Sequence, residues 1–290
     1  SMSAGLWLAL AASLGFAALD GVRKHLVQRL SPITTAALMN GAQAVILLGV
    51  ALLEHGGVPE APPAFYGIVL VTAVINLVTT LMYLRAVQRS PLSLTIPYLA
   101  FTPALLLLTA WVVLGELPSA RGAFGVVLVT LGAFVLPGVR TWRAPLAALA
   151  REPGSRLMLG VALIWAVSSA LDKRAVGWAS PTYYGGLVFG LSAVATLGYT
   201  VLYQRAELRA ARAQWPWLTA AAVGSAGALW AQYASYATLP VSYTIAIKRA
   251  GMLGSVLIGW RFFGEGELGP RLVGASIMLA GVLLIVLSPG

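Results

Sequence analysis

Apolar segments of about 20 residues, the length a helix needs to cross the hydrocarbon core of a bilayer, recur along the whole chain. Inside a bilayer only helices and closed barrels satisfy all of their backbone hydrogen-bonding groups. The runs therefore predict an all-α membrane protein. We expect ten transmembrane helices, joined by short connections, at 4–24, 33–53, 64–86, 92–114, 121–138, 157–177, 183–203, 217–238, 242–262 and 270–287.

The composition agrees with this fold class and leaves no stretch for a large soluble domain. Of 290 residues, 59% are hydrophobic and 10% are charged, whereas soluble domains are about 25% charged. A net charge of +10 would suggest nucleic acid as the partner of a soluble protein. Here the arginines crowd the short connections, as the cytoplasmic loops of membrane proteins require, so we expect no nucleic-acid partner. The chain has no cysteine, which excludes disulfides and thiolate ligands.

The two halves of the chain resemble each other at a constant shift of 149 residues. The shared positions include a Ser-Pro pair, a Trp-x-x-x-Gly-Glu motif and several glycines. The matching pairs are Lys24 and Lys173, Ser31 and Ser180, Pro32 and Pro181, Gly41 and Gly190, Pro91 and Pro240, Ser93 and Ser242, Thr95 and Thr244, Ile96 and Ile245, Trp111 and Trp260, Gly115 and Gly264, Glu116 and Glu265, Gly125 and Gly274, and Gly132 and Gly281.

Five spans per half is an odd number, so the second half enters the membrane from the opposite side. This predicts two inverted five-helix repeats, an architecture of secondary transporters in which the substrate site lies near the midplane between the repeats. We divide the chain into a first repeat at 1–138, a basic connecting loop at 139–156 and a second repeat at 157–290.

Basic residues gather in the connections after the odd-numbered spans. The rule that cytoplasmic loops are rich in Lys and Arg then places these connections in the cytoplasm and both termini outside. Little basic charge beyond Arg121 lies on the other side. The residues counted are Arg23, Lys24, Arg29, Arg85, Arg89, Arg140, Arg143, Arg151, Arg156, Arg205, Arg209, Arg212, Arg261 and Arg271.

Two adjacent cations, Lys248 and Arg249, lie within the ninth span. A cation near the middle of a span costs roughly 2.5–3.5 kcal/mol on insertion scales, so the pair needs a wet cavity, a counter-ion or an anionic ligand. The alternatives are an ion pair that locks helices together, or side chains that extend to the nearer membrane face. The equivalent positions of the first half are Leu99 and Ala100, which favours a function specific to the second half.

Two acidic residues, Asp20 and Asp172, lie well within predicted spans. Asp20 and Lys24 are four residues apart, so they can pair on one helix; a proton-carrying role for Asp20 is the alternative. Asp172 could neutralise Lys248 or Arg249, or change its protonation during transport. Even with both acids paired, the interior keeps positive charge, which attracts anions.

Polar and aromatic side chains within the spans complete the candidate substrate site. Each could instead serve helix packing through interhelical hydrogen bonds. The full set of predicted substrate-binding residues is Lys248, Arg249, Lys173, Asp172, Asn76, Tyr83, Tyr98, Trp165 and Tyr233.

Motifs of enzymes are missing from the sequence. There is no phosphate-binding glycine loop, no His-x-x-His spacing and no nucleophile elbow, and His25 and His55 are far apart. We predict a protein that is not an enzyme and that holds neither a cofactor nor a metal.

Ten spans in two halves, each ending in Trp-x-x-x-Gly-Glu at 111–116 and 260–265, resemble the drug/metabolite transporter (DMT) superfamily, EamA type, over essentially the whole chain. AIKRAG at 246–251 is similar to the Lys-Arg signature in the ninth span of plastidic triose-phosphate and sugar-phosphate translocators. DKRA at 172–175 is similar to their basic stretch in span six. The resemblance implies that Lys173, Lys248 and Arg249 hold a phosphate or comparable anion, and it implies cytoplasmic termini, so both orientations stay open.

These observations predict a secondary transporter of a small, phosphorylated or carboxylated organic anion, working by alternating access in a bacterial-type inner (plasma) membrane. The alternatives are an exporter of amino acids or drug-like compounds with a mainly aromatic pocket, and a membrane scaffold that transports nothing. We expect a small-molecule substrate and membrane lipid as partners and leave a homodimer open. The identity of the substrate, the direction of transport and the coupling ion do not follow from the sequence.

Overall fold

A computed structural model describes residues 2–90, 95–136, 151–253 and 268–288, and all regular elements in these ranges are helical. The described part of the first half contains five helices and one 3₁₀ segment. They are α1 (Met2–Val27), α2 (Pro32–His55), α3 (Pro63–Arg89), η1 (Ile96–Ala100), α5 (Phe101–Leu114) and α6 (Ala120–Val135).

The second half repeats this series of helices, with a short additional segment before its third long helix. The elements are α8 (Pro153–Val176), α9 (Pro181–Tyr203), α10 (Arg205–Ala211), η2 (Arg212–Gln214), α11 (Trp215–Ser235), α12 (Val241–Ala250) and α14 (Leu268–Val286). Counting η1 with α5, and leaving out α10 and η2, ten helices correspond to the ten predicted spans.

The halves begin their second helices in the same way. Ser31 caps α2, where its hydroxyl accepts a hydrogen bond from the Thr34 amide at 3.2 Å. Ser180 caps α9, where its hydroxyl accepts from the Tyr183 amide at 3.2 Å. In both helices a proline follows in the first turn, where no amide proton is needed. The repeated Ser-Pro pair is therefore a helix-start signal.

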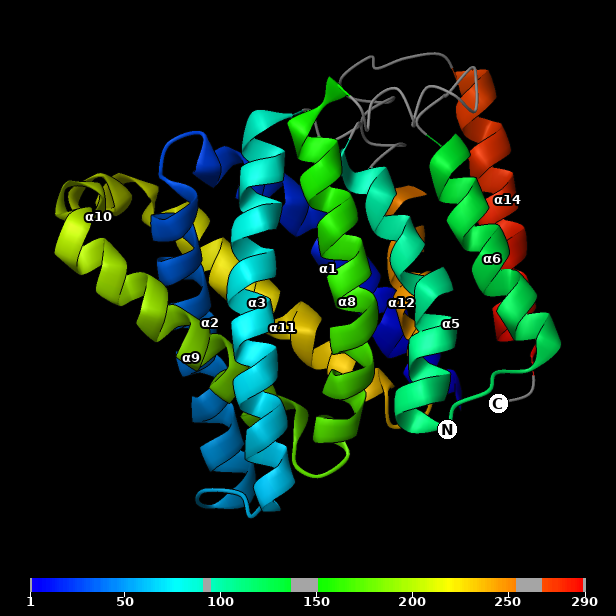
Figure 1. The fold of residues 1–290 in the computed structure, drawn as a ribbon, viewed down its shortest axis with the longest axis horizontal. Coiled ribbons are helices and arrows are strands. Elements are labelled where there is room, and N and C mark those ends of the chain that lie inside the picture. Colours follow the sequence, from blue (N-terminus) through cyan, green and yellow to red (C-terminus); the bar gives the residue numbers. More distant parts are fainter. Residues whose placement is uncertain (1, 91–94, 137–150, 254–267, 289–290) are drawn as a thin grey trace.

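The packing of the helices is symmetric between the halves. The main contacts join α2 to α9 and α6 to α14, while α1 packs on α11 just as α3 packs on α8. Exchanging each helix for its equivalent in the other half reproduces these contacts, as a pseudo-two-fold axis would. In Figure 1, α1 begins at the lower edge and α8 at the upper edge, so the equivalent helices run in opposite directions. The start of α1 and the end of α14 both lie towards the lower edge, which fits an even number of crossings.

Glycines allow α6 and α14 to cross closely. A Cβ atom on Gly125 would lie 2.6 Å from the carbonyl oxygen of Gly281, and one on Gly132 would lie 2.8 Å from that of Gly274. Contacts this short leave no room for a side chain, so the backbones touch, as at small-residue interfaces between membrane helices. Gly125 is equivalent to Gly274, and Gly132 to Gly281, so the 149-residue shift turns each of these contacts into the other.

The outer surface is apolar. Six of the described helices are long and apolar enough to cross a membrane, and two shorter apolar helices cover Ala120–Val135 and Leu272–Val286. Large apolar side chains point outward along them, where a soluble protein would carry charges. Examples are Trp7, Leu14, Val45, Leu53, Leu70, Val112, Val194 and Leu202. The chain is an integral membrane protein.

Three details differ from the sequence prediction or lie beyond the described residues. In its described residues, the fourth span is the 3₁₀ turn η1 followed by α5, and Pro103 has no amide proton to donate to the Leu99 carbonyl group four residues before it. The segment Arg205–Gln214, predicted as a loop, forms α10 and η2. In the ninth span α12 ends at Ala250, and 254–262 of the predicted span lie outside the described residues.

Candidate functional site

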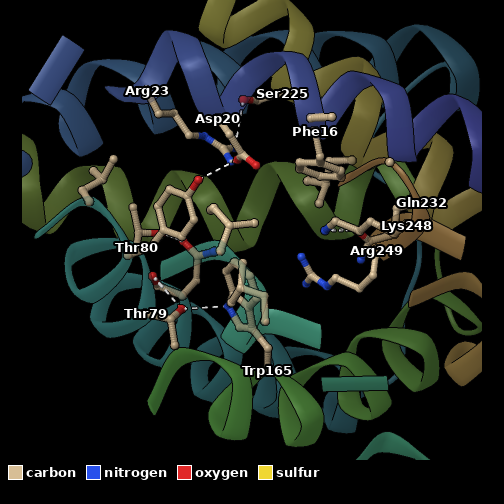
Figure 2. Close-up of a pocket in the computed structure, with 18 of the residues that line it drawn as sticks. Phe16, Asp20, Arg23, Thr79, Thr80, Trp165, Ser225, Gln232, Lys248 and Arg249 are labelled. Atoms are coloured by element: carbon tan, nitrogen blue, oxygen red, sulfur yellow. Dashed lines mark hydrogen bonds and ion pairs between the residues drawn. The ribbon is translucent and has the colours of Figure 1, made fainter. Parts of the chain in front are cut away.

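A cavity of about 730 Å³ lies between the two halves. Its walls come from α1, α2, α3 and η1 of the first half and from α8, α9, α11 and α12 of the second. Figure 2 shows the charged side chains of α1 and α12 pointing into this space. Its volume is that of a typical small-molecule site, roughly 300–1,000 Å³.

The short helix α12 is held at both ends. At its start the Val241 amide donates to Glu116 Oε2 at 3.1 Å, an acidic group at the positive end of a helix. At its end the Ser13 hydroxyl lies 3.0 Å from the carbonyl oxygens of both Ile247 and Lys248. Gly115, at φ +70°, ends α5 and directs the chain into Glu116. The Gly-Glu motif thus positions the helix that carries the two predicted cations.

Lys248 lies in the last turn of α12 with its ammonium group in the cavity. Its Nζ donates to Gln232 Oε1 at 2.7 Å and lies 3.6 Å from the ring centroid of Phe16. The ring of Trp165 is 5.8 Å away on another side. Aromatic faces and an amide oxygen stabilise a cation, but they are uncharged and do not neutralise it.

Arg249 is 7% exposed, and its guanidinium lies 5.8 Å from the ring centroid of Trp165. Within the described residues its buried Nε has no hydrogen-bond partner. In the same part of the chain, no carboxylate lies within ion-pair distance of Arg249 or Lys248. A buried, unpaired guanidinium is unfavourable unless another charge reaches it. The side chain is oriented towards an open cavity (Figure 2), so a ligand can supply that charge.

The other end of the cavity holds a cluster of Asp20, Arg23 and Tyr83. The Tyr83 hydroxyl donates to Asp20 Oδ1 at 2.6 Å, and Arg23 Nη1 lies 3.7 Å from the same oxygen. Arg23 also donates to the Ser225 hydroxyl at 3.4 Å. The predicted Asp20–Lys24 pair is therefore wrong: Asp20 pairs with Arg23, and Lys24 donates to the carbonyl oxygens of Val87 and Ser90.

Lys173 lies outside the large cavity, contrary to the role predicted for it. It forms an ion pair with Glu116 and donates to the carbonyl oxygen of Leu239 at 2.7 Å. These groups line a separate cavity of about 290 Å³. Consecutive residues of a helix point about 100° apart, so Asp172 faces the large cavity while its neighbour Lys173 faces the end of α11.

The remaining predicted residues divide in a similar way. Asn76, Trp165, Tyr233 and Asp172 line the large cavity, and Trp165 Nε1 donates to the Thr79 hydroxyl at 3.1 Å. Tyr98 does not line it and instead packs edge-on against Phe134, with ring centroids 6.0 Å apart.

Among the described residues that line the large cavity, basic side chains outnumber acidic ones. Asp20 and Asp172 face four basic side chains, Arg23, Lys24, Lys248 and Arg249. Arg23 and Phe16 belong to this site but are absent from the predicted set. The spacing of Phe16, Asp20 and Arg23, three and four residues apart on α1, is the signal that could have found them. No group of three or more residues suited to a metal ion occurs in the described ranges.

Comparisons with known proteins identify both the family and the fold. The model of the EamA-like transporter family matches residues 3–137 and again 153–287. A solved structure titled only "Crystal structure of protein" superposes with a TM-score of 0.72 at 17% identity, covering 98% of each chain. At that identity the likeness shows the fold alone. A search of curated proteins found no match.

Proposed function

The chain belongs to the EamA-like transporter family, and on that basis we propose that it carries a small organic anion across a bacterial-type inner membrane. Transport is secondary and works by alternating access between the two halves. The anion is a phosphorylated or carboxylated metabolite that binds in the large cavity, between Lys248 and Arg249 at one end and Arg23 at the other.

The observation that supports this most strongly is the state of Arg249. Its guanidinium is buried and points into the cavity, and its Nε has no partner among the described residues. Lys248, beside it, is held by an amide and aromatic rings and has no neighbouring carboxylate in that part of the chain. Arginine suits planar, two-point recognition of carboxylate and phosphate groups. A bound anion would complete this arrangement.

The walls between the charged ends suit the uncharged part of such a metabolite. Hydroxyl and amide groups from Thr80, Asn76 and Asn40 offer hydrogen bonds, while the rings of Phe16 and Trp165 offer apolar faces. Asn40 Oδ1 is buried and has no partner among the described residues. Because both halves contribute walls, a rocking of one half against the other would expose the same site to either side of the membrane.

Uptake into proteoliposomes tests the proposal. The wild type is expected to take up radiolabelled glycerol 3-phosphate or succinate. Lys248→Gln and Arg249→Gln should each reduce uptake at least tenfold, because loss of one partner of a buried charge pair costs about 2–5 kcal/mol. Arg174→Gln is the matched control, since Arg174 is exposed and bonds only the Val113 carbonyl oxygen and the face of Trp178 in the described structure. Full uptake by a Lys248→Gln, Arg249→Gln double variant would reject the site.

A second candidate rests on the aromatic lining. Rings from five residues face the cavity, a pattern that also suits flat, apolar or cationic compounds. They are Phe16, Tyr83, Trp165, Phe189 and Tyr233. Competition with the uptake by tetraphenylphosphonium, combined with no competition by phosphate esters or dicarboxylates, would favour an exporter of drug-like compounds over the anion carrier.

A further inference from the structure

Asp172 is a buried carboxylate on the wall of the large cavity. It is 9% exposed and lies near the end of α8. In the described residues no cation lies within ion-pair distance of it. Asp20, the other acidic group of the cavity, differs because Arg23 lies beside it on the same helix. Asp172 therefore has no fixed positive partner that holds it in the ionised form.

The hydroxyl groups of Tyr184 and Thr72, next to Asp172, lie within hydrogen-bond distance of more oxygen atoms than they have protons to donate. Tyr184 Oη lies 2.5 Å from Asp172 Oδ1 and 2.9 Å from Thr72 Oγ1. A phenol has one proton, so it can donate to only one of these oxygens. Thr72 Oγ1 in turn lies 2.8 Å from the carbonyl oxygen of Ile68, and its hydroxyl also has one proton.

Two proton arrangements fit these same positions. In the first, Asp172 is ionised, Tyr184 donates to it, and the Thr72 hydroxyl donates to Tyr184. In the second, Asp172 is protonated and donates to Tyr184, which donates to Thr72, which donates to the Ile68 carbonyl oxygen. Passing between them requires the two hydroxyl groups to rotate and one proton to arrive or leave. No heavy atom has to move.

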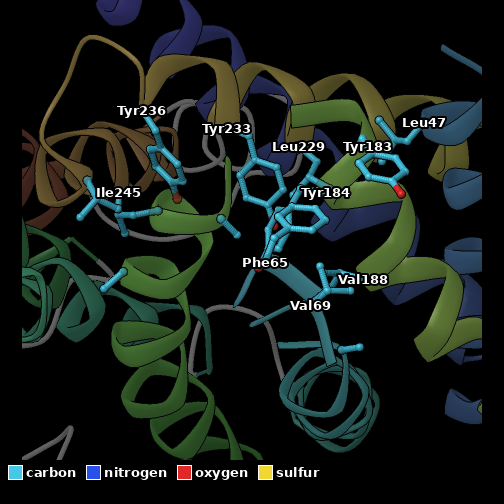
Figure 3. Packing of buried hydrophobic residues seen from close by; sticks show 14 of the residues in the cluster. Leu47, Phe65, Val69, Tyr183, Tyr184, Val188, Leu229, Tyr233, Tyr236 and Ile245 are labelled. Atoms are coloured by element: carbon cyan, nitrogen blue, oxygen red, sulfur yellow. The ribbon is translucent and has the colours of Figure 1, made fainter. Parts of the chain in front are cut away.

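The surroundings contain few other groups that could respond to pH. Tyr184 of α9, Tyr233 of α11 and Tyr236, directly after α11, lie around the carboxylate. The Tyr184 and Tyr233 ring centroids are 5.4 Å apart in the cluster drawn in Figure 3. The ammonium of Lys248, on α12, interacts with Asp172 electrostatically. The tyrosines are ordinarily neutral near pH 7, so the carboxylate is the group of this cluster suited to exchange a proton.

We propose that Asp172 is the proton-binding site of the transporter and that it couples proton movement to anion movement. One proton passes from cavity water to Asp172, which becomes a neutral carboxylic acid, and the hydroxyls of Tyr184 and Thr72 reverse their donation. The same proton returns to water when the cavity faces the other side. This inference rests on the proposed anion transport, which supplies the second partner of the coupling.

The direction of coupling follows from charge. Protonation of Asp172 removes one negative charge near Lys248 and raises the positive surplus of the cavity by one unit. An anion then binds more tightly, and by thermodynamic reciprocity a bound anion favours the protonated carboxyl group. Proton and anion therefore load together and leave together, as in a symporter.

Infrared spectroscopy of the purified protein tests the proton site without any substrate. Lowering the pH of the wild type should produce a C=O stretching band of a protonated carboxylic acid that Asp172→Asn lacks and Asp20→Asn keeps. Tyr184→Phe should shift the frequency of this band, because it removes the direct hydrogen-bond partner. Identical pH-difference spectra for the wild type and Asp172→Asn would overturn the assignment.

Transport of glycerol 3-phosphate tests the coupling. In wild-type proteoliposomes an inward proton gradient should drive accumulation, and the dye pyranine should report protons entering with the anion. Asp172→Asn should still exchange external for internal glycerol 3-phosphate but lose accumulation and proton entry. Glu60→Gln, at an exposed loop position, is the matched control and should behave like the wild type.

The outcomes separate the two proposals. Gradient-driven accumulation by Asp172→Asn at the wild-type level would overturn the coupling role while leaving anion transport intact. Absence of both exchange and uptake of glycerol 3-phosphate and succinate by the wild type would instead reject the proposed function. The infrared band would then still decide whether Asp172 binds a proton.

Discussion

Lys24 and Lys173 stand 149 residues apart and make equivalent contacts in the two halves. Lys24 Nζ donates to the carbonyl oxygen of Ser90 at 3.1 Å, and Lys173 Nζ donates to that of Leu239 at 2.7 Å. Ser90 and Leu239 are themselves 149 residues apart, and each follows the third long helix of its half. A lysine at this position satisfies a carbonyl group where the chain leaves a helix. The repeated lysine is thus explained by the fold.

Lys173→Ala is expected to destabilise the protein and to spare anion binding. The substitution leaves Glu116 without its cation and the Leu239 carbonyl oxygen without its donor, a loss of about 1–3 kcal/mol. Thermal unfolding in detergent measures it, with Arg174→Ala as the exposed neighbour, for which a change within about 0.5 kcal/mol is expected. Loss of anion binding by Lys173→Ala at unchanged stability would restore the substrate-binding role that the sequence suggested.

Among the elements, α12 depends on a close approach to α1. A Cβ atom on Gly251 would lie 2.6 Å from the carbonyl oxygen of Ser13 and 2.5 Å from its hydroxyl oxygen. The same hydroxyl satisfies the last carbonyl groups of α12. Small residues at this crossing therefore place Lys248 and Arg249 against Phe16 and Trp165.

Gly251→Val should separate α12 from α1, because the backbone of Ser13 cannot move aside as a flexible side chain would. We expect a loss of about 1–3 kcal/mol from overpacking, together with weaker anion binding. Gly227→Ala on α11 is the matched control: nothing lies within 4 Å of its Cβ position, and alanine favours a helix by up to about 1 kcal/mol. Melting temperature and elution profile in detergent measure both variants. Wild-type stability and binding for Gly251→Val would contradict the packing described.

For the whole molecule, hydropathy and the 149-residue shift were enough to predict ten helices in two related halves. The charges within the spans also led us to include Lys248, Arg249 and Asp172 in the candidate substrate site, because intramembrane charge often marks a functional site, and all three line the large cavity. The predicted set misses Arg23, since a cation near a helix end looks like a loop residue, and it includes Lys173, since the sequence does not show how α8 is rotated. Helix α10 is missed because a short polar segment carries no hydropathy signal.

The central claim is that the cavity between the halves binds an anion through positive charge that the protein leaves uncompensated. Titration calorimetry with three probes of similar size tests it most directly: glycerol 3-phosphate, neutral glycerol and cationic choline, each added to the wild type and to the Lys248→Gln, Arg249→Gln double variant. The account predicts that the wild type binds only the phosphate ester and that the double variant loses at least tenfold in affinity. Equal binding of choline or glycerol by the wild type, or unchanged binding of the phosphate ester by the double variant, would contradict it.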